Sequence, residues 1–370
     1  MKRFVVAIRI VVSMLVLAFM ALMSVSIAEA MLSHPSEPPE RKHAEIITVW
    51  HVVRYKPYSG SVGTIITEAA RGIEKGEYGV FFSVEAITMQ EYQKRTELGE
   101  KPDVISFPSG IRDADGLYML AKEDYTMLDT MLDESLIKAG SHDDALYALC
   151  YAQSPCVLIE NNELAKKAGV TLPENELDAE TIIKALDNAD AGAIKRPLIS
   201  GRPERWAMIG ACGECADTAL FKEGKAALCI DDIRIARDIS ALNEKGKGFN
   251  YTVHKLCNAY GNAQLIAISA QAGEWKTERA KKLISILLSE KYQQKLCSIG
   301  LCPAIIGDKS GFDGTKTPID VIDALADTRL PNAFLLARYS DAIDEEAQRA
   351  LEGDEQARAS LNKRYEELCG

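Results

Sequence analysis

Between residues 45 and 107, three strand patterns alternate with two helix patterns, and these five segments constrain the fold of this chain more than any other feature. Residues 45–53 form an apolar, β-rich run, and residues 62–73 follow with apolar side chains at helical spacing. We then expect a second strand at residues 79–84, a second helix at 89–98 and a third strand at 103–107. Strands that alternate with helices form an open, mostly parallel sheet with helical crossovers. The sequence therefore predicts an α/β fold.

The rest of the chain continues with the same elements before it becomes helical. We expect strands at residues 145–152, 156–160, 221–230 (after an initial turn) and 263–269, and helices at 161–168 and 178–187, the latter capped by Asp178. Thr277 is expected to cap a further helix, and residues 332–368 to be helical with a break near Gly353. At 370 residues, the chain is long enough for two domains.

Residues 1–30 have the pattern of an export leader. Three basic residues, Lys2, Arg3 and Arg9, precede the uncharged apolar run of residues 11–27. Ala28-Glu29-Ala30 then offers a small-x-small cleavage site. The run also approaches the length that spans a bilayer, so an uncleaved membrane anchor is the alternative. The proline-containing residues 31–44 then predict a tether. We expect an exported protein, in the periplasm or at the extracellular face of the cytoplasmic membrane.

The exported part of the chain is acidic. Residues 1–30 hold three basic side chains and one acidic side chain, which leaves 40 basic and 53 acidic residues and a net charge of −13 for the remainder. This charge argues against nucleic acid and against anionic lipid surfaces as partners. A local binding site can still carry a net positive charge.

The nine cysteines form no recognisable metal site. Cys212-Gly213-Glu214-Cys215 is compatible with a redox pair or with half of a zinc site, but no second such pair and no paired histidines follow at metal-ligand spacing. Buried thiols with one or two disulfides are therefore favoured. We find no nucleophile with a base in its local context, no phosphate-binding loop and no cofactor motif, so we expect neither enzyme activity nor a cofactor nor a metal.

Five short motifs carry a resemblance to a known family. They are Lys101-Pro102-Asp103-Val104-Ile105, Tyr147-Ala148-Leu149-Cys150-Tyr151, the segments at residues 221–228 and 293–304, and Pro331-Asn332. In this order they resemble the extracellular solute-binding proteins of ABC importers, in the sugar-binding branch that includes maltose-binding protein. The chain departs from the family pattern in two places. Cys150 stands where the family usually has proline, and the segment between Glu160 and Phe221 has 60 residues, which is shorter than is usual in the family.

The resemblance implies the periplasmic-binding-protein type II architecture, with a ligand cleft between two lobes. Lobe one would comprise residues 45–150 plus 261–302, and lobe two residues 151–260 plus 303–370. A monomer would capture a small solute, most often a carbohydrate, by hinge closure and deliver it to the permease subunits of an ABC importer. The alternatives are an accessory protein that reports solute to a membrane sensor kinase, and a thiol redox protein that uses Cys212 and Cys215.

The resemblance also places candidate ligand-binding residues at strand ends and beside the crossover between lobes. These residues are Trp50, His51, Arg54, Ser106, Ser109, Gln153, Ser154, Trp206 and Tyr339. Trp206 follows a polar, turn-like run, so we expect a partly exposed indole on which a sugar could stack. Each aromatic residue could instead be a packing residue, and Gln153 and Ser154 could hydrogen-bond within the hinge.

Two further features could meet a negatively charged ligand. Arg202 and Arg205 flank the polar run before Trp206, although solvated charge is the commoner role of such arginines. Residues 60–63 are expected to start a helix, where backbone N–H groups can contact a hydroxyl or an anion.

Overall fold

The computed structural model describes residues 14, 16, 17, 19, 20, 45–54, 60–121, 124, 132, 134–173, 176–257, 260–305 and 329–369. The expectations for the leader and the tether therefore fall almost entirely outside the described residues. The chain divides into two units, residues 1–45 and residues 46–370, and the second unit holds the features discussed below. Among the described residues, no helix combines the length and the apolar character needed to cross a membrane.

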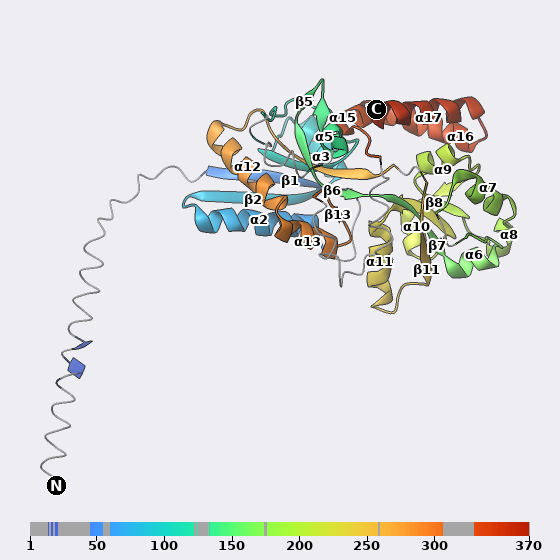
Figure 1. Cartoon of the computed structure of the whole chain (residues 1–370), viewed down its shortest axis with the longest axis horizontal. Coiled ribbons are helices and arrows are strands. Elements are labelled where there is room, and N and C mark those ends of the chain that lie inside the picture. Colours follow the sequence, from blue (N-terminus) through green and yellow to red (C-terminus); the bar gives the residue numbers. More distant parts are fainter. Residues whose placement is uncertain are drawn as a thin grey trace, which may run out of the picture. The chain divides into compact units, whose positions relative to one another are not determined.

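The first sheet has six strands in the order β13-β6-β12-β3-β1-β2 (Figure 1). Their bounds are β1 Glu45–Val53, β2 Val80–Thr88, β3 Val104–Pro108, β6 Ala148–Ser154, β12 Asn262–Ile268 and β13 Cys302–Pro303. Strands β1 and β3 are parallel, whereas β12 runs antiparallel to both β3 and β6. The sheet is therefore mixed, and the expectation of a mostly parallel sheet is wrong. The reason is that β12 enters the sheet from the far end, on the return of the chain from the second sheet.

Helices α2 (Val62–Gly76), α3 (Met89–Glu97), α12 (Glu274–Leu287) and α13 (Glu290–Ser298) accompany this sheet. The predicted apolar side of α2 is buried, and α12 and α13 pack against this helix. Gly60 has a φ of +64°, and a Cβ there would overlap the Ile299 side chain. The chain can therefore approach α13 closely as it enters α2 only because residue 60 is glycine.

The second sheet has five strands in the order β11-β7-β10-β8-β9. Their bounds are β7 Cys156–Asn161, β8 Ile199–Gly201, β9 Cys215–Ala216, β10 Leu228–Asp232 and β11 Tyr251–Lys255. The helices in this part of the chain are α6 Asn162–Lys167, α7 Ala179–Asp187, α8 Ala191–Ile194, α9 Pro203–Ile209, α10 Thr218–Lys222 and α11 Arg234–Asn243. Strands β8, β9 and β10 are parallel and β7 is antiparallel to β10, so this sheet is also mixed.

One proline separates the two sheets where the chain first crosses between them. β6 ends at Ser154 in the first sheet, and β7 begins at Cys156 in the second. Pro155 has no N–H to donate to a ladder and a restricted φ, so the ladder is interrupted at that residue. The predicted break at Ser154-Pro155 is therefore confirmed. The chain returns to the first sheet between β11 and β12.

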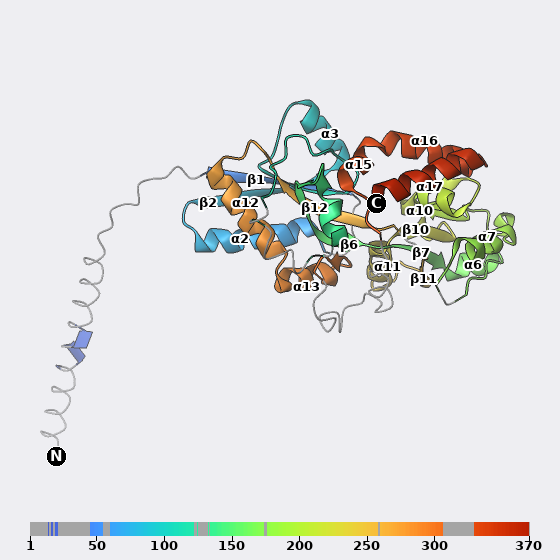
Figure 2. The same ribbon diagram turned by 45° about the horizontal axis from the view of Figure 1, so that its top comes forward.

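The last helices are α15 (Ala333–Arg338), α16 (Ser340–Leu351) and α17 (Glu355–Cys369). Phe334 packs in the core of the first sheet, whereas Ile343 and Leu361 pack in the core of the second. Helices α16 and α17 lie side by side in both views (Figures 1 and 2) and contact each other. A small helix α5 (Glu134–Ala139) and a two-stranded sheet of β4 (Ser141–His142) and β5 (Ala145–Leu146) complete the described elements.

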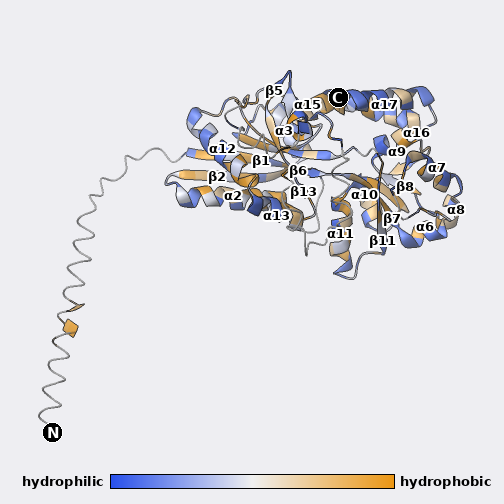
Figure 3. Cartoon of the chain, viewed as in Figure 1, coloured by the Kyte–Doolittle hydropathy of each residue, from blue (hydrophilic) through white to orange (hydrophobic). Residues whose placement is uncertain are grey.

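Apolar residues concentrate on the strands and polar residues on the outer helices, as Figure 3 shows for α17. Asp178 caps α7 as predicted, since its Oδ1 accepts a hydrogen bond from the Thr181 N–H at 2.8 Å. The predicted cap at Thr277 is wrong. Helix α12 begins one turn earlier, at Glu274, and the Thr277 hydroxyl instead donates to the Ala272 carbonyl. Trp275 therefore lies inside the first turn of this helix.

Candidate functional site

The carboxyl ends of β1 and β3 lie side by side because these strands are parallel, and they bring two predicted site residues together. His51 and Ser106 are register partners, and His51 Nδ1 lies 3.0 Å from Ser106 Oγ. The same hydroxyl also lies 2.8 Å from the Tyr151 hydroxyl. Burial, with the nearby charge of Arg234, lowers the pKa of His51 to about 4. The imidazole is therefore neutral at pH 7, and the pair forms a buried polar network.

Four predicted residues line a small cavity of about 80 Å³ at this edge of the first sheet. These residues are His51, Arg54, Gln153 and Ser154, and the lining also includes Asn262 and the second-sheet residues Asp232 and Arg234. Arg54 Nη1 donates to Asn262 Oδ1 at 2.8 Å. Arg234 Nη2 donates to the Gly60 carbonyl at 3.4 Å, so this side chain reaches from α11 to the start of α2. The cavity therefore has walls from both sheets.

A larger cavity of about 600 Å³ also has walls from both sheets. The first-sheet side contributes Arg54, Ser109 and Asn262, and the second-sheet side Arg202, Glu204, Thr218 and Asp231. Ser109 is tied to the backbone of β12, because its Oγ donates to the Ala263 carbonyl and accepts from the Ala263 N–H. A ligand in this cavity would touch both parts of the chain.

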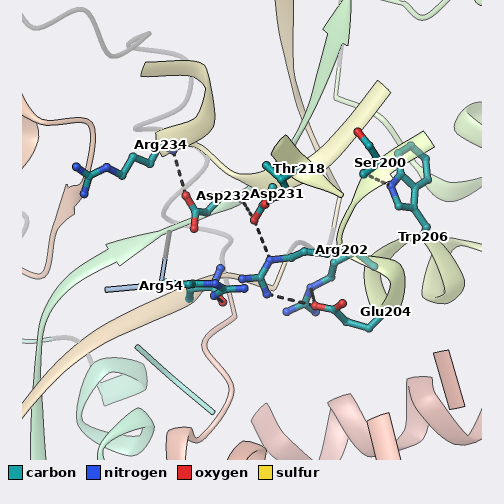
Figure 4. Close-up of polar contacts among 11 residues, drawn as sticks. Arg54, Ser200, Arg202, Glu204, Trp206, Thr218, Asp231, Asp232 and Arg234 are labelled. Atoms are coloured by element: carbon teal, nitrogen blue, oxygen red, sulfur yellow. Dashed lines mark hydrogen bonds and ion pairs between the residues drawn. The ribbon is translucent and has the colours of Figure 1, made fainter. Parts of the chain in front are cut away.

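Asp231, at the end of β10, organises the second-sheet wall (Figure 4). Its carboxylate accepts from Arg202 Nε at 2.9 Å and from the Thr218 hydroxyl at 2.7 Å. Arg202 Nη1 also donates to Glu204 at 3.2 Å, whereas its Nη2 is buried without a hydrogen-bond partner among the described residues. The wall therefore presents a buried arginine whose orientation is held by two carboxylates and which retains donor capacity.

Trp206 is not exposed in the way that the sequence suggested. Its side chain is 0% exposed in the core of the second sheet, and its Nε1 donates to the Ser200 carbonyl at 2.6 Å (Figure 4). The prediction of a partly exposed indole is wrong because the polar run before Trp206 forms the first turn of α9 rather than a surface turn. The helix directs Trp206 toward β8 and the core.

The other two predicted aromatic residues, Trp50 and Tyr339, do not line either cavity. Trp50 is adjacent to His51 on β1, and alternate residues of a strand face opposite sides of the sheet. Its indole lines a separate cavity of about 490 Å³, built only from residues on the first-sheet side, and the Arg95 guanidinium lies 5.1 Å from the ring centre. Tyr339 precedes α16, half-exposed, with the Arg364 guanidinium 5.0 Å from its ring centre.

Four further residues of the cavity walls were not predicted from the sequence: Asn262, Asp231, Asp232 and Arg234. A signal was present for the two aspartates. They follow the apolar run of residues 226–230 directly, in the way that His51 and Arg54 end the first strand. No comparable signal marks Asn262, because its role depends on the pairing of β12 with β6.

The cysteines carry no feature of a redox or metal site. All nine are free thiols, so the expectation of one or two disulfides is wrong. Burial, with the negative charges of Glu204 and Asp231, raises the pKa of the Cys215 thiol to about 12. A redox pair needs the opposite shift. Within the described part of the chain, no group of three or more His, Cys, Asp or Glu side chains could hold a metal ion.

No protein-family model and no curated protein sequence matches this chain. Solved structures do match. One is the ABC substrate-binding protein Lmo0181 from Listeria monocytogenes in complex with cycloalternan, at 16% identity and a TM-score of 0.62 over 87% of this chain and 97% of that one. Another is the GacH receptor of Streptomyces glaucescens GLA.O, solved unliganded and with acarbose, at 14% identity and a TM-score of 0.62 over 88% and 98%.

A third match is the cyclic α-maltosyl-1,6-maltose binding protein from Arthrobacter globiformis, at 12% identity and a TM-score of 0.61 over 88% of this chain and 98% of that one. At such identities the likeness establishes the fold. The chain has the two-lobe α/β fold of carbohydrate-binding ABC substrate-binding proteins, and this expectation from the sequence is confirmed.

Proposed function

We propose that this chain is an extracytoplasmic solute-binding protein that captures a carbohydrate between two lobes and delivers it to an ABC importer. The observation that carries the proposal is the cavity of about 600 Å³ whose walls come from both sheets. Its volume is within the range of small-molecule sites. The likeness to structures described with cycloalternan, acarbose and cyclic α-maltosyl-1,6-maltose supports the ligand class.

The proposed lobes follow the two sheets: one holds residues 45–154 and 262–303, with Phe334 in its core, and the other holds residues 156–255 and helices α16 and α17. The boundaries expected at residues 150 and 302 therefore move to the ends of β6 and β13, at Ser154 and Pro303. The interruption at Pro155 and the return between β11 and β12 are the points about which the lobes would rotate. A ligand that contacts both walls stabilises the closed arrangement more than the open one, and the importer would recognise the closed form. The leader in the sequence is consistent with export to the outer face of the membrane.

We also propose that the protein catalyses no reaction on its ligand. The buried pair of His51 and Ser106 has the residue types of a catalytic dyad, but Ser106 is 0% exposed and thus inaccessible to a substrate. The low pKa of His51 makes its imidazole a weak base at pH 7. The pair therefore acts as a structural link between β1 and β3.

A thermal-shift screen of the full-length chain against neutral and acidic mono- and oligosaccharides tests the proposal. A ligand that binds only the native state raises the unfolding midpoint by mass action. We expect at least one sugar to raise it, and small-angle scattering to show compaction with that sugar. Binding of amines or metal ions together with no response to any sugar would contradict the carbohydrate assignment.

A further inference from the structure

The small cavity beside the larger one is unusually rich in hydrogen-bond donors. Ser154 and Asn262 are register partners on the neighbouring strands β6 and β12, and both line this cavity. Their side chains are buried, with exposures of 4% and 7%. Ser154 Oγ and Asn262 Nδ2 have no hydrogen-bond partner among the described residues. Buried polar groups in native proteins nearly always have a hydrogen-bond partner, so these two atoms are expected to bond to a group that is not part of the chain, a water or a ligand atom.

The start of α2 adds further donors to the same cavity, through Ser61 and Val62. This 15-residue helix has no side-chain cap, and its first turn holds no acidic residue. Its first backbone N–H groups are thus left without a side-chain acceptor, and the helix dipole makes this end favourable for negative charge.

The charges around the cavity also favour an anion. Arg54 and Arg234 line it, with Asp232 as the one carboxylate of the lining. Arg54 takes part in no ion pair among the described residues, and within them its guanidinium donates to the neutral amide of Asn262. His51 adds no charge at pH 7, since its imidazole is neutral. The lining is therefore net positive in a chain whose exported part has a net charge of −13.

The size and position of the cavity limit what the anion can be. A single water needs roughly 10–15 Å³ of such space, so about 80 Å³ holds a group of a few heavy atoms and no sugar ring. The larger cavity shares Arg54, Pro108 and Asn262 with it, so the two are adjacent. A ring in the larger cavity could place one substituent in the smaller.

We propose that the small cavity binds the anionic group of the ligand, and that the ligand is an acidic sugar, a uronate or a sugar phosphate, rather than a neutral one. This inference rests on the proposed function for the carbohydrate part of the ligand. Arg54 supplies the charge, Asn262 and Ser154 supply neutral hydrogen bonds, and the N-terminus of α2 supplies backbone donors. Arg202 holds the wall of the adjacent cavity.

Isothermal titration of the full-length chain with matched pairs of sugars tests the inference. The probes are D-galacturonate against D-galactose, D-glucuronate against D-glucose, glucose 6-phosphate and inorganic phosphate. We expect at least one acidic sugar to bind tenfold or more tightly than its neutral counterpart. Its affinity should fall at least tenfold in Arg54→Gln and in Asn262→Leu, and recover in part in Arg54→Lys. Arg349→Gln removes the same charge from α16, away from both cavities, and should leave the affinity unchanged.

The outcomes separate the two proposals. Equal or tighter binding of the neutral sugars, with no effect of Arg54→Gln, would overturn the anion site and leave the carbohydrate function in place. Binding of inorganic phosphate in an Arg54-dependent manner, without a response to any sugar, would support the anion site and overturn the carbohydrate assignment. If neither sugar nor phosphate binds the folded chain, as judged by circular dichroism, both proposals fail.

Discussion

His51 Nδ1 and Ser106 Oγ lie 3.0 Å apart across the parallel strands β1 and β3, and both side chains are buried. The relationship places a titratable group inside the first sheet in its neutral form. Because the pKa of His51 in the folded chain, about 4, lies below the ordinary histidine value of 6.5, the unfolded chain binds an extra proton between these two pH values. The contribution of His51 to the free energy of unfolding is therefore fully present above pH 6.5 and is lost as the pH falls toward 4.

We expect acidification from pH 7 to pH 4 to remove roughly 3 kcal/mol of stability through His51, since one pKa unit corresponds to about 1.4 kcal/mol. His51→Asn, which retains a neutral polar side chain, should lose less stability over the same range. Urea unfolding of both chains at several pH values measures the difference. Parallel pH profiles for the two chains would show that His51 does not titrate in this way.

Trp206 should behave as a core residue. Replacement by alanine removes a fully buried indole, and we expect a loss of about 3–5 kcal/mol in the free energy of unfolding. Trp206→Phe retains much of the volume but removes the hydrogen bond to the Ser200 carbonyl, so a loss of about 1–2 kcal/mol is expected. Trp275→Ala, at a partly buried position on α12, is the control and should cost less. A small effect of Trp206→Ala on stability with a large effect on sugar affinity would restore its assignment as a stacking residue.

Two glycines near α2 form a matched pair for a test of backbone strain. Gly60 has a positive φ and faces Ile299, so Gly60→Ala should cost at least about 2 kcal/mol. Gly72 lies inside α2, and an added Cβ would meet nothing within 4 Å. Gly72→Ala should therefore stabilise the chain by about 0.5–1 kcal/mol. Thermal unfolding measures whether Gly60→Ala lowers the stability of the chain and Gly72→Ala raises it. Equal changes in stability for the two variants would contradict the conformation assigned to residue 60.

The two cysteines of the C-x-x-C segment should differ in reactivity. Cys212 is exposed, whereas the pKa of the Cys215 thiol is about 12, so almost no thiolate is present there at pH 8. We expect iodoacetamide to modify Cys212 at least tenfold faster than Cys215, as followed by peptide mass spectrometry. Cys212→Ser should not accelerate the reaction of Cys215. Rapid modification of Cys215 in the native chain would reopen the redox alternative.

Helices, strands and caps were predictable where their formation depends only on residues that are close together in the sequence. The strand at residues 45–53 matches β1, and the apolar face of α2 matches the buried face of that helix. Asp178 caps its helix as expected because a cap bond spans only three residues. Thr277 failed as a cap because Gly273 already allows the helix to begin at Glu274.

The candidate site was only partly predictable. His51, Arg54, Gln153 and Ser154 were identified from their places at strand ends and beside the crossover, and all four line the small cavity. The facing residues Asn262 and Arg234 come from segments 100 or more positions away from Arg54 in the sequence. No local pattern reports which distant side chains will complete a cavity.

The sequence by itself determined the alternating strands and helices of residues 45–108, the crossing at Pro155 and the α/β fold class, because hydrophobic periodicity and turn chemistry act over short stretches of chain. Only the tertiary structure decided that both sheets are mixed and that Trp206 is buried rather than exposed. It also decided that Ser154 Oγ and Asn262 Nδ2 come together in one cavity without a hydrogen-bond partner among the described residues. These features depend on strand pairing over long separations and on which side of an element meets the core. The free energy that decides them comes from burial and from long-range hydrogen bonds, which exist only once the chain has folded.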